Sequence, residues 1–320
     1  MHRIGIVGLG HLGEIHLKQW LEIVPKESIM CFDTDIERLE KLTDQYQVSK
    51  TEDYARLLDF ATIIDVVTPT QFHHYYAAEA LRAEKHVFIE KPVCQSMEEI
   101  DELINLQKKS GTLVQIGHVE RYNPAFKAVE SKILHPKFFE VHRLAPFVAR
   151  GTEVSVIMDL MIHDLDIIAH LVRSEVIDIK AKGVSIISKT PDIANARLEF
   201  ANGCVANLTA SRISMKKMRK MRIFSDNGYI SIDFLDKNAE SFEIMDPMDV
   251  PDIEGLLFTP NDGLDKKLVV KSYEKLDNNA IFQELTDFYT RVTTKLNYTQ
   301  VDLVSGSRTM ALALKIQQLI

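Results

Sequence analysis

The sequence has few cysteines, no excess of positive charge and no long apolar run, and each shortage excludes a class of protein. Its three cysteines have no CxxC pair and no regular spacing, which is typical of a reduced cytoplasmic protein rather than a disulfide-stabilised one. The net charge of −8 provides no general attraction to nucleic acid or anionic lipid, so we expect neither as a partner. No apolar run approaches membrane-spanning length, and the glycine-rich start is not typical of a signal peptide. We therefore expect a cytoplasmic location and no membrane contact.

Strand-like and helix-like stretches alternate through residues 1–120. RIGIVG is followed by HLGEIHLKQWLEIV, and TIIDVVTP is followed by FHHYYAAEALRA. This alternation predicts an α/β domain with a doubly wound parallel sheet covered by helices on both faces. Such a sheet binds ligands at the carboxyl ends of its strands.

Residues 121–320 show a different pattern, with longer β-rich stretches. Asn202-Gly203 and Asn227-Gly228 lie between such stretches, and this dipeptide favours tight hairpins because both residues tolerate positive φ. We therefore predict a second, α+β domain over 121–320 with a large, open, mostly antiparallel sheet. The closing stretch SGSRTMALALKIQQLI is apolar at its end and should dock against a domain, with packing back on the first domain as one option.

The segment Gly8-Leu9-Gly10-His11-Leu12-Gly13 matches G-x-G-x-x-G between a predicted strand and a predicted helix. There the glycines permit a tight turn and close approach of a pyrophosphate to the helix N-terminus. Asp33 follows the second strand, where a carboxylate accepts hydrogen bonds from an adenosine ribose and repels a 2′-phosphate. These residues predict NAD rather than NADP. The alternative is a glycine turn without a ligand and an Asp33 that caps the next helix.

The segment HVFIEKP places Glu90, Lys91 and Pro92 directly after another buried strand. Pro92 ends the strand because it has no backbone donor, and it favours extended geometry at Lys91. Lys91 then projects into the crevice where a nicotinamide would lie. A solvated lysine at a strand end is the alternative.

GLGHLG, TPTQFHH, FIEKP and DLMIHDLD together resemble the glucose-fructose oxidoreductase, inositol dehydrogenase and MocA (Gfo/Idh/MocA) family of NAD(P)-dependent dehydrogenases. The resemblance covers the whole chain in domain order. It implies a Rossmann domain for the cofactor and a second domain whose sheet covers the substrate and forms a homodimer or homotetramer. It also implies that Lys91 lies between nicotinamide and substrate, with Asp159 and His163 as the proton-handling pair. The residues that it implies beside the cofactor are Thr68, Pro69 and His73.

The predicted helix DLMIHDLDIIAHL, residues 159–171, has a narrow polar stripe on an apolar cylinder. At about 100° per residue, Asp159, His163, Asp166 and His170 share the stripe, whereas Asp164 points away and is expected to be structural. We expect the stripe to face a polar pocket. Asp159 lies one turn from His163, and we also expect it to cap the helix. A core histidine satisfied by a neighbour is the alternative for His163.

A mechanism follows from these residue types. Neutral His163 accepts the proton of a secondary alcohol, Lys91 stabilises the developing alkoxide, and Asp159 holds the imidazole in the useful tautomer. Asp166 and His170 are expected to be packing or supporting groups. Asp159 and His163, with His118 or His73, could instead bind zinc or iron, but Lys91 would place a positive charge beside the ion. We therefore predict no metal.

The segment QIGHVERYNPAF, residues 115–126, completes the predicted contacts, and Arg143 and Arg150 are weaker candidates for binding a carboxylate or phosphate. Together these segments look most like family members that oxidise the C3 hydroxyl of a UDP-N-acetylglucosamine-like sugar. A dinucleotide-binding sensor without turnover is the alternative. The predicted cofactor contacts are Gly8, Leu9, Gly10, His11, Leu12, Gly13, Asp33, Thr68, Pro69, His73, Glu90, Lys91 and Gln115. The predicted substrate contacts are Lys91, His118, Arg121, Tyr122, Asn123, Asp159 and His163.

Overall fold

The computed structural model describes residues 2–148, 154–260, 263–273 and 278–320. The chain divides into two compact units. Unit 1 comprises Met1–Val119 and Asn279–Ala311, and unit 2 comprises Glu120–Asn278 and Leu312–Ile320. The predicted second domain began at residue 121 and ran to the end of the chain, so the two divisions differ mainly in residues 279–311.

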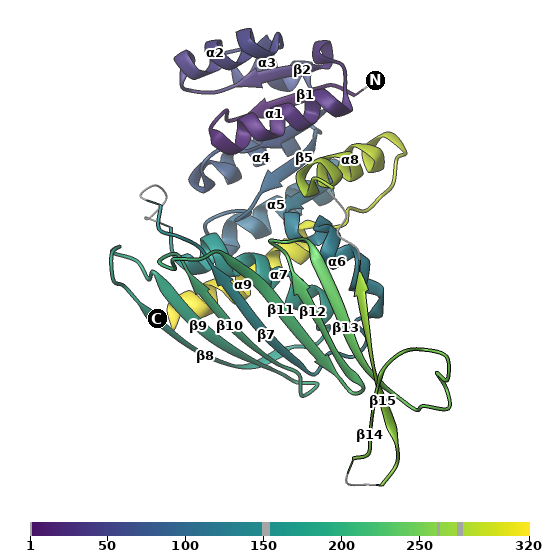
Figure 1. Ribbon diagram of the computed structural model, residues 1–320. Coiled ribbons are helices and arrows are strands. Elements are labelled where there is room, and N and C mark those ends of the chain that lie inside the picture. The colour runs from purple at the N-terminus through teal and green to yellow at the C-terminus, as the bar shows by residue number, and fades with distance from the viewer. Residues whose placement is uncertain (1, 149–153, 261–262, 274–277) are drawn as a thin grey trace. The chain divides into compact units, whose positions relative to one another are not determined.

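Unit 1 is built on a parallel sheet with the strand order β3-β2-β1-β4-β5-β6, which confirms the predicted doubly wound sheet. Figure 1 labels β1, β2 and β5 of this sheet. Every residue of β1 and β4 is buried, as expected when helices cover both faces. The strand order changes direction between β1 and β4, where an open parallel sheet forms its ligand crevice. The strands are β1 Ile4–Val7, β2 Ile29–Phe32, β3 Ser49–Lys50, β4 Ile63–Val66, β5 His86–Glu90 and β6 Val114–Gly117.

The helices of unit 1 begin and end where the sequence supplies caps. The Asp35 side chain accepts a hydrogen bond from the first turn of α2, Ser96 does the same for α5, and Gly111 ends α5 in the left-handed conformation. The helices are α1 His11–Ile23, α2 Ile36–Tyr46, α3 Tyr54–Phe60, α4 His73–Arg82, α5 Met97–Ser110 and α8 Ala280–Thr293, with the 3-10 turns η1 Lys26–Ser28 and η2 Thr70–Phe72.

Helix α8 belongs to the core of unit 1 although it comes late in the chain. Its residues Leu285 and Phe288 are fully buried in the cluster that contains Trp20 of α1 and Phe88 of β5. The rings of Phe88 and Phe288 lie 5.9 Å apart between centroids. The closing helix α9, Leu303–Gln318, begins in unit 1 and ends in unit 2.

Unit 2 is built on a sheet with the strand order β14-β15-β13-β12-β11-β7-β10-β9-β8, and its described pairings are antiparallel except for β7 with β10. This confirms the predicted, mostly antiparallel sheet. Gly203 and Gly228 have φ of 83° and 145° at the two predicted hairpin turns. The strands are β7 Phe138–Leu144, β8 Val176–Val184, β9 Ile193–Phe200, β10 Val205–Ser211, β11 Met218–Ser225, β12 Gly228–Asp233, β13 Asn238–Met245, β14 Leu256–Phe258 and β15 Lys266–Tyr273.

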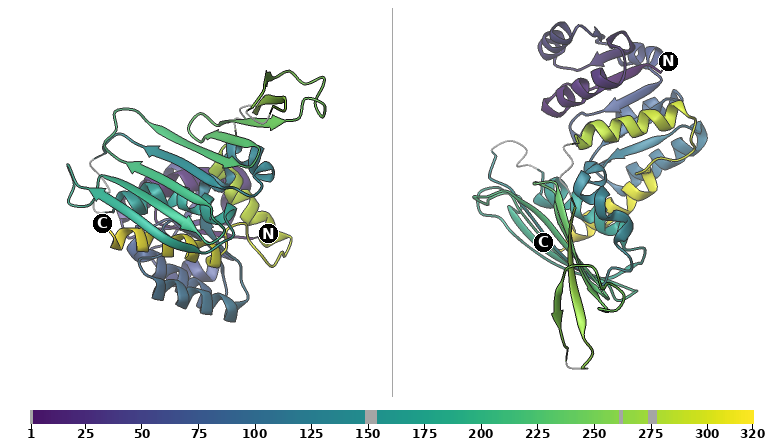
Figure 2. Two further views of the ribbon diagram at one scale, coloured as in Figure 1. Left: turned by 90° about the horizontal axis from the view of Figure 1, so that it is seen from below. Right: turned by 45° about the vertical axis from the view of Figure 1, so that its right-hand side comes forward.

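Short helices cover one face of this sheet (Figure 2). Helix α6 packs against β12, β13 and β15, and the turn η5 packs against β10. Along β10 buried and half-buried residues alternate up to Ala210, as expected for a sheet with one covered face. The elements are η3 Val119–Tyr122, α6 Pro124–Val129, η4 Glu130–Lys132, η5 Ile157–Met161 and α7 Ile162–Leu171.

The predicted helix over 159–171 begins two residues earlier than expected and opens with a π-helical turn, η5, over Ile157–Met161. The side chain of Ser155 accepts a long hydrogen bond, 3.4 Å, from the backbone N–H of Met158. The prediction that Asp159 caps the helix is therefore wrong, because Asp159 lies inside the first turn. None of the helices in the described ranges has the length and apolar character needed to cross a membrane.

Candidate cofactor and catalytic sites

The glycine loop joins β1 to the N-terminus of α1 with the geometry that a dinucleotide requires. Gly8 has a φ of 94°, which favours glycine. A Cβ on Gly13 would lie 2.0 Å from the carbonyl oxygen of Gly8, so only glycine lets the helix approach the loop this closely. The loop is tied to β2 because the backbone N–H of Leu9 donates to Oδ2 of Asp33 over 2.6 Å. Of the remaining loop residues, His11 is exposed and Leu12 is half-buried.

A cavity of about 270 Å³ opens beside this loop. It is lined by Gly8, Gly10 and Asp33, and also by Thr68 and Pro69 from the end of β4. Five predicted cofactor residues thus share one cavity at the carboxyl ends of neighbouring parallel strands. The other lining residues were not predicted, although they end β2 or come after β2 and β4 in the chain: Phe32, Thr34, Asp35, Arg38, Val67, Phe72 and Tyr76.

The residues around the cavity fit a bound dinucleotide. A Cβ on Gly10 would meet nothing within 4 Å, so the loop has open space where a pyrophosphate would approach the N-terminus of α1. Oγ1 of Thr68 is buried and has no hydrogen-bond partner among the described residues. A buried hydroxyl of this kind is normally satisfied, and a ligand would satisfy it.

Two alanine substitutions separate the structural role of the loop from its binding role. We expect Gly13→Ala to lower the free energy of unfolding by about 1–3 kcal/mol, because its Cβ overlaps the Gly8 carbonyl. We expect Gly10→Ala to leave stability unchanged but to weaken NADH binding, because its Cβ occupies the open space. Thermal denaturation and NADH fluorescence titration measure the two effects. NADH binding by Gly10→Ala with wild-type affinity would contradict this assignment.

His73 joins the two loops that carry Thr68 and Lys91. Its Nδ1 lies 2.8 Å from the carbonyl oxygen of Pro92, and its Nε2 lies 2.7 Å from the carbonyl oxygen of Thr68. The side chain is buried, and this burial lowers its pKa. Both ring nitrogens thus face protein carbonyls, and contact of His73 with a cofactor remains a prediction.

Lys91 is half-buried directly after β5. The residue before it, Glu90, is buried, and its Oε2 accepts a hydrogen bond of 3.0 Å from the backbone N–H of Lys91. Two other predicted residues are also buried: Gln115, whose amide donates to the carbonyl oxygen of Glu284 on α8 over 3.3 Å, and His118. Contacts of Gln115 and His118 with cofactor or substrate remain predictions.

The predicted proton-handling pair lies on unit 2, and Lys91 lies on unit 1. Asp159 is in the π-helical turn η5, and His163 is the second residue of α7; both side chains are half-buried. Single π-helical turns within α-helices occur frequently at functional sites. His170, further along the same helix, pairs with Glu130 over 2.7 Å, and this hydrogen bond lowers the pKa of Glu130 to about 2.

Two buried arginines fix the helix that carries His163. Arg143 of β7 binds Asp164 through Nε and Nη2, each over 2.8 Å, and its Nη1 lies 2.9 Å from Oε1 of Glu120. Arg121 binds Asp166 in the same two-pronged manner, over 2.5 and 3.1 Å. Burial opposes the charge of Arg143, but Asp164 and Glu120 outweigh it and raise its pKa. The structural role predicted for Asp164 is confirmed.

Several predicted substrate contacts are engaged within unit 2. The ion pair with Asp166 holds Arg121, and Tyr122 is buried. The amide of Asn123 donates to Glu120 and to the carbonyl oxygen of Phe234, and its oxygen accepts from the N–H of Ala125 at the start of α6. Substrate binding by these three residues stays a prediction.

The weaker arginine candidates have different outcomes. Arg143 is held by buried carboxylates, so a carboxylate or phosphate ligand would have to displace them. Arg150 lies outside the described residues.

Within the part of the chain that the structure describes, no group of three or more His, Cys, Asp or Glu side chains is arranged to hold a metal ion.

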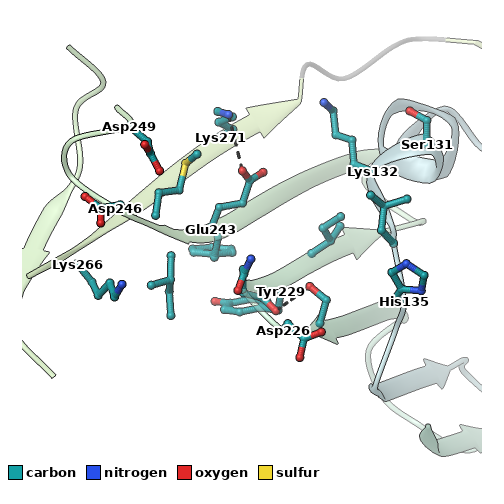
Figure 3. A pocket seen from close by; sticks show the side chains of 18 residues that line it. Ser131, Lys132, His135, Asp226, Tyr229, Glu243, Asp246, Asp249, Lys266 and Lys271 are labelled. Carbon is teal, nitrogen blue, oxygen red and sulfur yellow. Dashed lines mark hydrogen bonds and ion pairs between the residues drawn. The ribbon is translucent and has the colours of Figure 1, made fainter. Parts of the chain in front are cut away.

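A larger hollow, of about 850 Å³, lies in unit 2 against β12, β13 and β15 (Figure 3). It is lined by side chains of both charges, including Lys132, Asp226, Glu243 and Lys271, and by Tyr229. Lys271 on β15 and Glu243 on the neighbouring strand β13 form a long ion pair of 3.9 Å. None of the predicted cofactor or substrate residues lines this hollow, so it gives no support to the predicted chemistry.

Comparison with known families gives matches to both halves of the chain. Residues 2–118 match the oxidoreductase family with an NAD-binding Rossmann fold, and residues 127–231 match the GFO/IDH/MocA C-terminal domain. The first match contains the glycine loop and Lys91, and the second contains Asp159 and His163.

Individual relatives agree with these matches. A UDP-N-acetylglucosamine 3-dehydrogenase from Acidithiobacillus ferrooxidans is 33% identical over 316 residues, which cover 98% of this chain and 96% of that protein. A scyllo-inositol 2-dehydrogenase (NAD+) from Bacillus subtilis is 27% identical over 66% of this chain and 68% of its own length. A solved structure of a UDP-N-acetylglucosamine 3-dehydrogenase from A. ferrooxidans superposes with a TM-score of 0.89 at 31% identity, covering 100% of this chain and 97% of that one.

Proposed function

The chain belongs to the Gfo/Idh/MocA family of NAD-binding oxidoreductases, and from this premise we propose that it oxidises a secondary alcohol of a nucleotide sugar. The proposed substrate is a UDP-N-acetylglucosamine-like sugar, with the C3 hydroxyl as the reacting group. The observation that carries this proposal is the 33% identity, over 98% of the chain, to a UDP-N-acetylglucosamine 3-dehydrogenase. A similarity that covers both units supports the same substrate class better than a similarity limited to the cofactor domain.

The cofactor is held by residues of unit 1. The glycine loop and the N-terminus of α1 would bind the pyrophosphate, and Asp33 and Thr68 would face the adenosine side of the cavity that they line. NAD, when bound, supplies the hydride acceptor. Lys91, half-buried after β5, would stabilise the negative charge that develops on the substrate oxygen.

The protein's own contribution to the proton transfer comes from unit 2. His163 accepts the hydroxyl proton of the substrate as general base, and Asp159 favours the protonated form of its imidazole. Asp164 and Asp166 each form an ion pair with a buried arginine. These ion pairs support the role of His163, because they hold the helix that carries it in place.

The position of Asp33 predicts a preference for NAD over NADP. Its carboxylate is in the cavity and is bound by the backbone N–H groups of Leu9 and Asp35. A ribose 2′-phosphate would meet this fixed negative charge, so we expect NADP to bind at least about tenfold more weakly than NAD. Parallel titrations of the protein with NADH and NADPH measure the difference. Equal or tighter binding of NADPH would overturn the preference.

A substrate panel tests the proposed reaction. Purified protein with NAD is mixed with UDP-N-acetylglucosamine, UDP-N-acetylgalactosamine, UDP-glucose, free N-acetylglucosamine and myo-inositol, and NADH formation is followed. We expect the highest kcat/KM with UDP-N-acetylglucosamine. A preference for myo-inositol would support dehydrogenase activity but contradict a nucleotide sugar as the substrate. Tight NADH binding without turnover of any compound would favour a sensor.

The proposed enzyme is a cytoplasmic homodimer or homotetramer that assembles through the sheet of unit 2. Support comes from apolar side chains that this unit leaves exposed, including Ile177 on β8 at 66% and Leu256 and Leu257 on β14 at 67% and 63%. Strands β8 and β14 are the two edge strands of the sheet, and exposed apolar side chains on an edge strand are typical of protein–protein contacts. The molar mass in solution, measured by light scattering, tests this; a mass of one chain would reject it.

A further inference from the structure

Three ionisable side chains form a buried chain in unit 1 that ends at the backbone of Lys91. They are Asp65 on β4, His16 on α1 and Glu90 at the end of β5; the first two are fully buried and Glu90 is 6% exposed. Nδ1 of His16 lies 2.9 Å from Oδ2 of Asp65, and its Nε2 lies 3.3 Å from Oε1 of Glu90. No step of the proposed reaction uses His16.

The two carboxylates favour the protonated form of His16. Nδ1 is hydrogen-bonded to Asp65, and Nε2 lies within ion-pair distance of Glu90, so both ring nitrogens have a negative charge nearby. Burial opposes the charge, but Asp65 and Glu90 outweigh it and raise the pKa of His16 to about 10. Asp65 is held in place from α1 a second time, because Nε1 of Trp20 donates to the same Oδ2 over 2.7 Å.

Glu90 connects this cation to Lys91. One carboxylate oxygen of Glu90 faces His16, and the other accepts the hydrogen bond from the backbone N–H of Lys91. The neighbouring strand leaves space for this carboxylate, since a Cβ on Gly117 would lie 2.7 Å from Oε1. Burial alone would raise the pKa of Glu90, but His16 and Lys91 outweigh it, so the pKa is lowered.

We propose that His16 is a positioning residue for Lys91, acting by keeping Glu90 ionised and fixed against the Lys91 backbone. This inference rests on the role of Lys91 in the proposed function. The charged and titratable groups near Glu90 come from three elements. They are His16 on α1, Lys91 after β5 and His73 on α4. The charge of Glu90 partly offsets the effect of burial, which lowers the pKa of His73. Asp65 on β4 faces the other side of His16.

The inference predicts a new pH dependence when the cation is removed. Without His16, burial of Glu90 is opposed mainly by Lys91, so the pKa of Glu90 rises. The ionised carboxylate is then present only above the new pKa and is lost as the pH falls through it. Activity should follow the ionised form, so the kcat of the variant should decline more steeply toward low pH than that of the wild type.

The test is the pH profile of kcat in His16→Gln, measured with UDP-N-acetylglucosamine or whichever compound of the panel is turned over. We expect kcat to be lowered about tenfold at the acidic end, with NADH affinity close to wild type. Glu90→Gln in the same background should remove the new ionisation from the profile. Trp20→Phe is the matched control on α1: it removes a hydrogen bond to Asp65 but keeps His16 and Glu90, and its profile should be that of the wild type.

The outcomes separate this inference from the proposed function. Loss of turnover in Lys91→Met, with a wild-type pH profile in folded His16→Gln, would overturn the inference alone. Full turnover in Lys91→Met would overturn the role of Lys91 and the inference with it. If His16→Gln does not fold, Gly117→Ala gives the second test, because its Cβ displaces the Glu90 carboxylate while His16 remains. A lowered kcat supports the inference there, and an unchanged kcat contradicts it.

Discussion

Replacing His163 with asparagine is expected to lower kcat by about 100- to 10,000-fold, the range typical of a lost general base. Asparagine has no group that accepts a proton near neutral pH, so the substrate hydroxyl would keep its proton. The affinity for NADH should stay close to wild type, because the cavity beside the glycine loop is lined by residues of unit 1. Steady-state kinetics and NADH titration measure the two quantities.

His170→Asn is the matched control for this variant. His170 lies on the same helix, is half-buried and pairs with Glu130, and we expect no direct part for it in the reaction. We therefore expect its kcat to remain within a few-fold of wild type. Equal losses in the two variants would indicate that any disturbance of α7 stops turnover, and an unchanged kcat in His163→Asn would reject the assigned base.

Arg143→Met is expected to lower the free energy of unfolding by about 3–5 kcal/mol. The substitution removes the cation that Asp164 and Glu120 share and leaves both carboxylates buried without it. The measurement is chemical denaturation of the variant beside the wild type. The loss should be accompanied by a lower kcat, because Asp164 is the neighbour of His163 on α7.

Arg219→Met tests whether burial, rather than charge alone, causes this loss. Arg219 lies 3.6 Å from the same Oε1 of Glu120, but its side chain is 47% exposed. Exposed ion pairs contribute at most about 1 kcal/mol, so this variant should stay within that range of the wild type. A similar loss in the two variants would contradict the special role of the buried pair.

The glycine loop and Asp33 could be predicted from the sequence because their signals are local. A strand, a glycine pattern and a helix follow one another without interruption, and an acid follows the next strand. The structure joins these signals through the hydrogen bond from Leu9 to Asp33. The four short motifs in the sequence resemble the Gfo/Idh/MocA family, and the family matches over both halves of the chain confirm this resemblance.

The start of the helix that carries His163 could not be predicted in the same way. A helical wheel assumes a constant angle per residue, and the π-helical turn over Ile157–Met161 departs from it. The wheel separated Asp164 from the stripe, but the structure buries Asp164 and Asp166 alike. The wheel could not show that Asp164 and Asp166 each bind an arginine, because those arginines belong to other elements.

Most of the other contacts that could not be predicted join residues that are distant in the sequence. The sequence places His16 only within a predicted helix, although the side chain lies between carboxylates from β4 and β5. Helix α8 was assigned to the second domain, but Leu285 and Phe288 belong to the core of unit 1. Such contacts depend on the order in which strands and helices pack, which amphipathic periodicity alone does not encode.

The most direct test of the central claim is the rate of NADH formation when the purified protein is mixed with NAD and UDP-N-acetylglucosamine. We expect turnover that produces one ketone for each NADH, with the oxidised carbon at C3, and its loss in His163→Asn. Tight NADH binding with no NADH formed from this sugar or from any other compound of the panel would contradict the account.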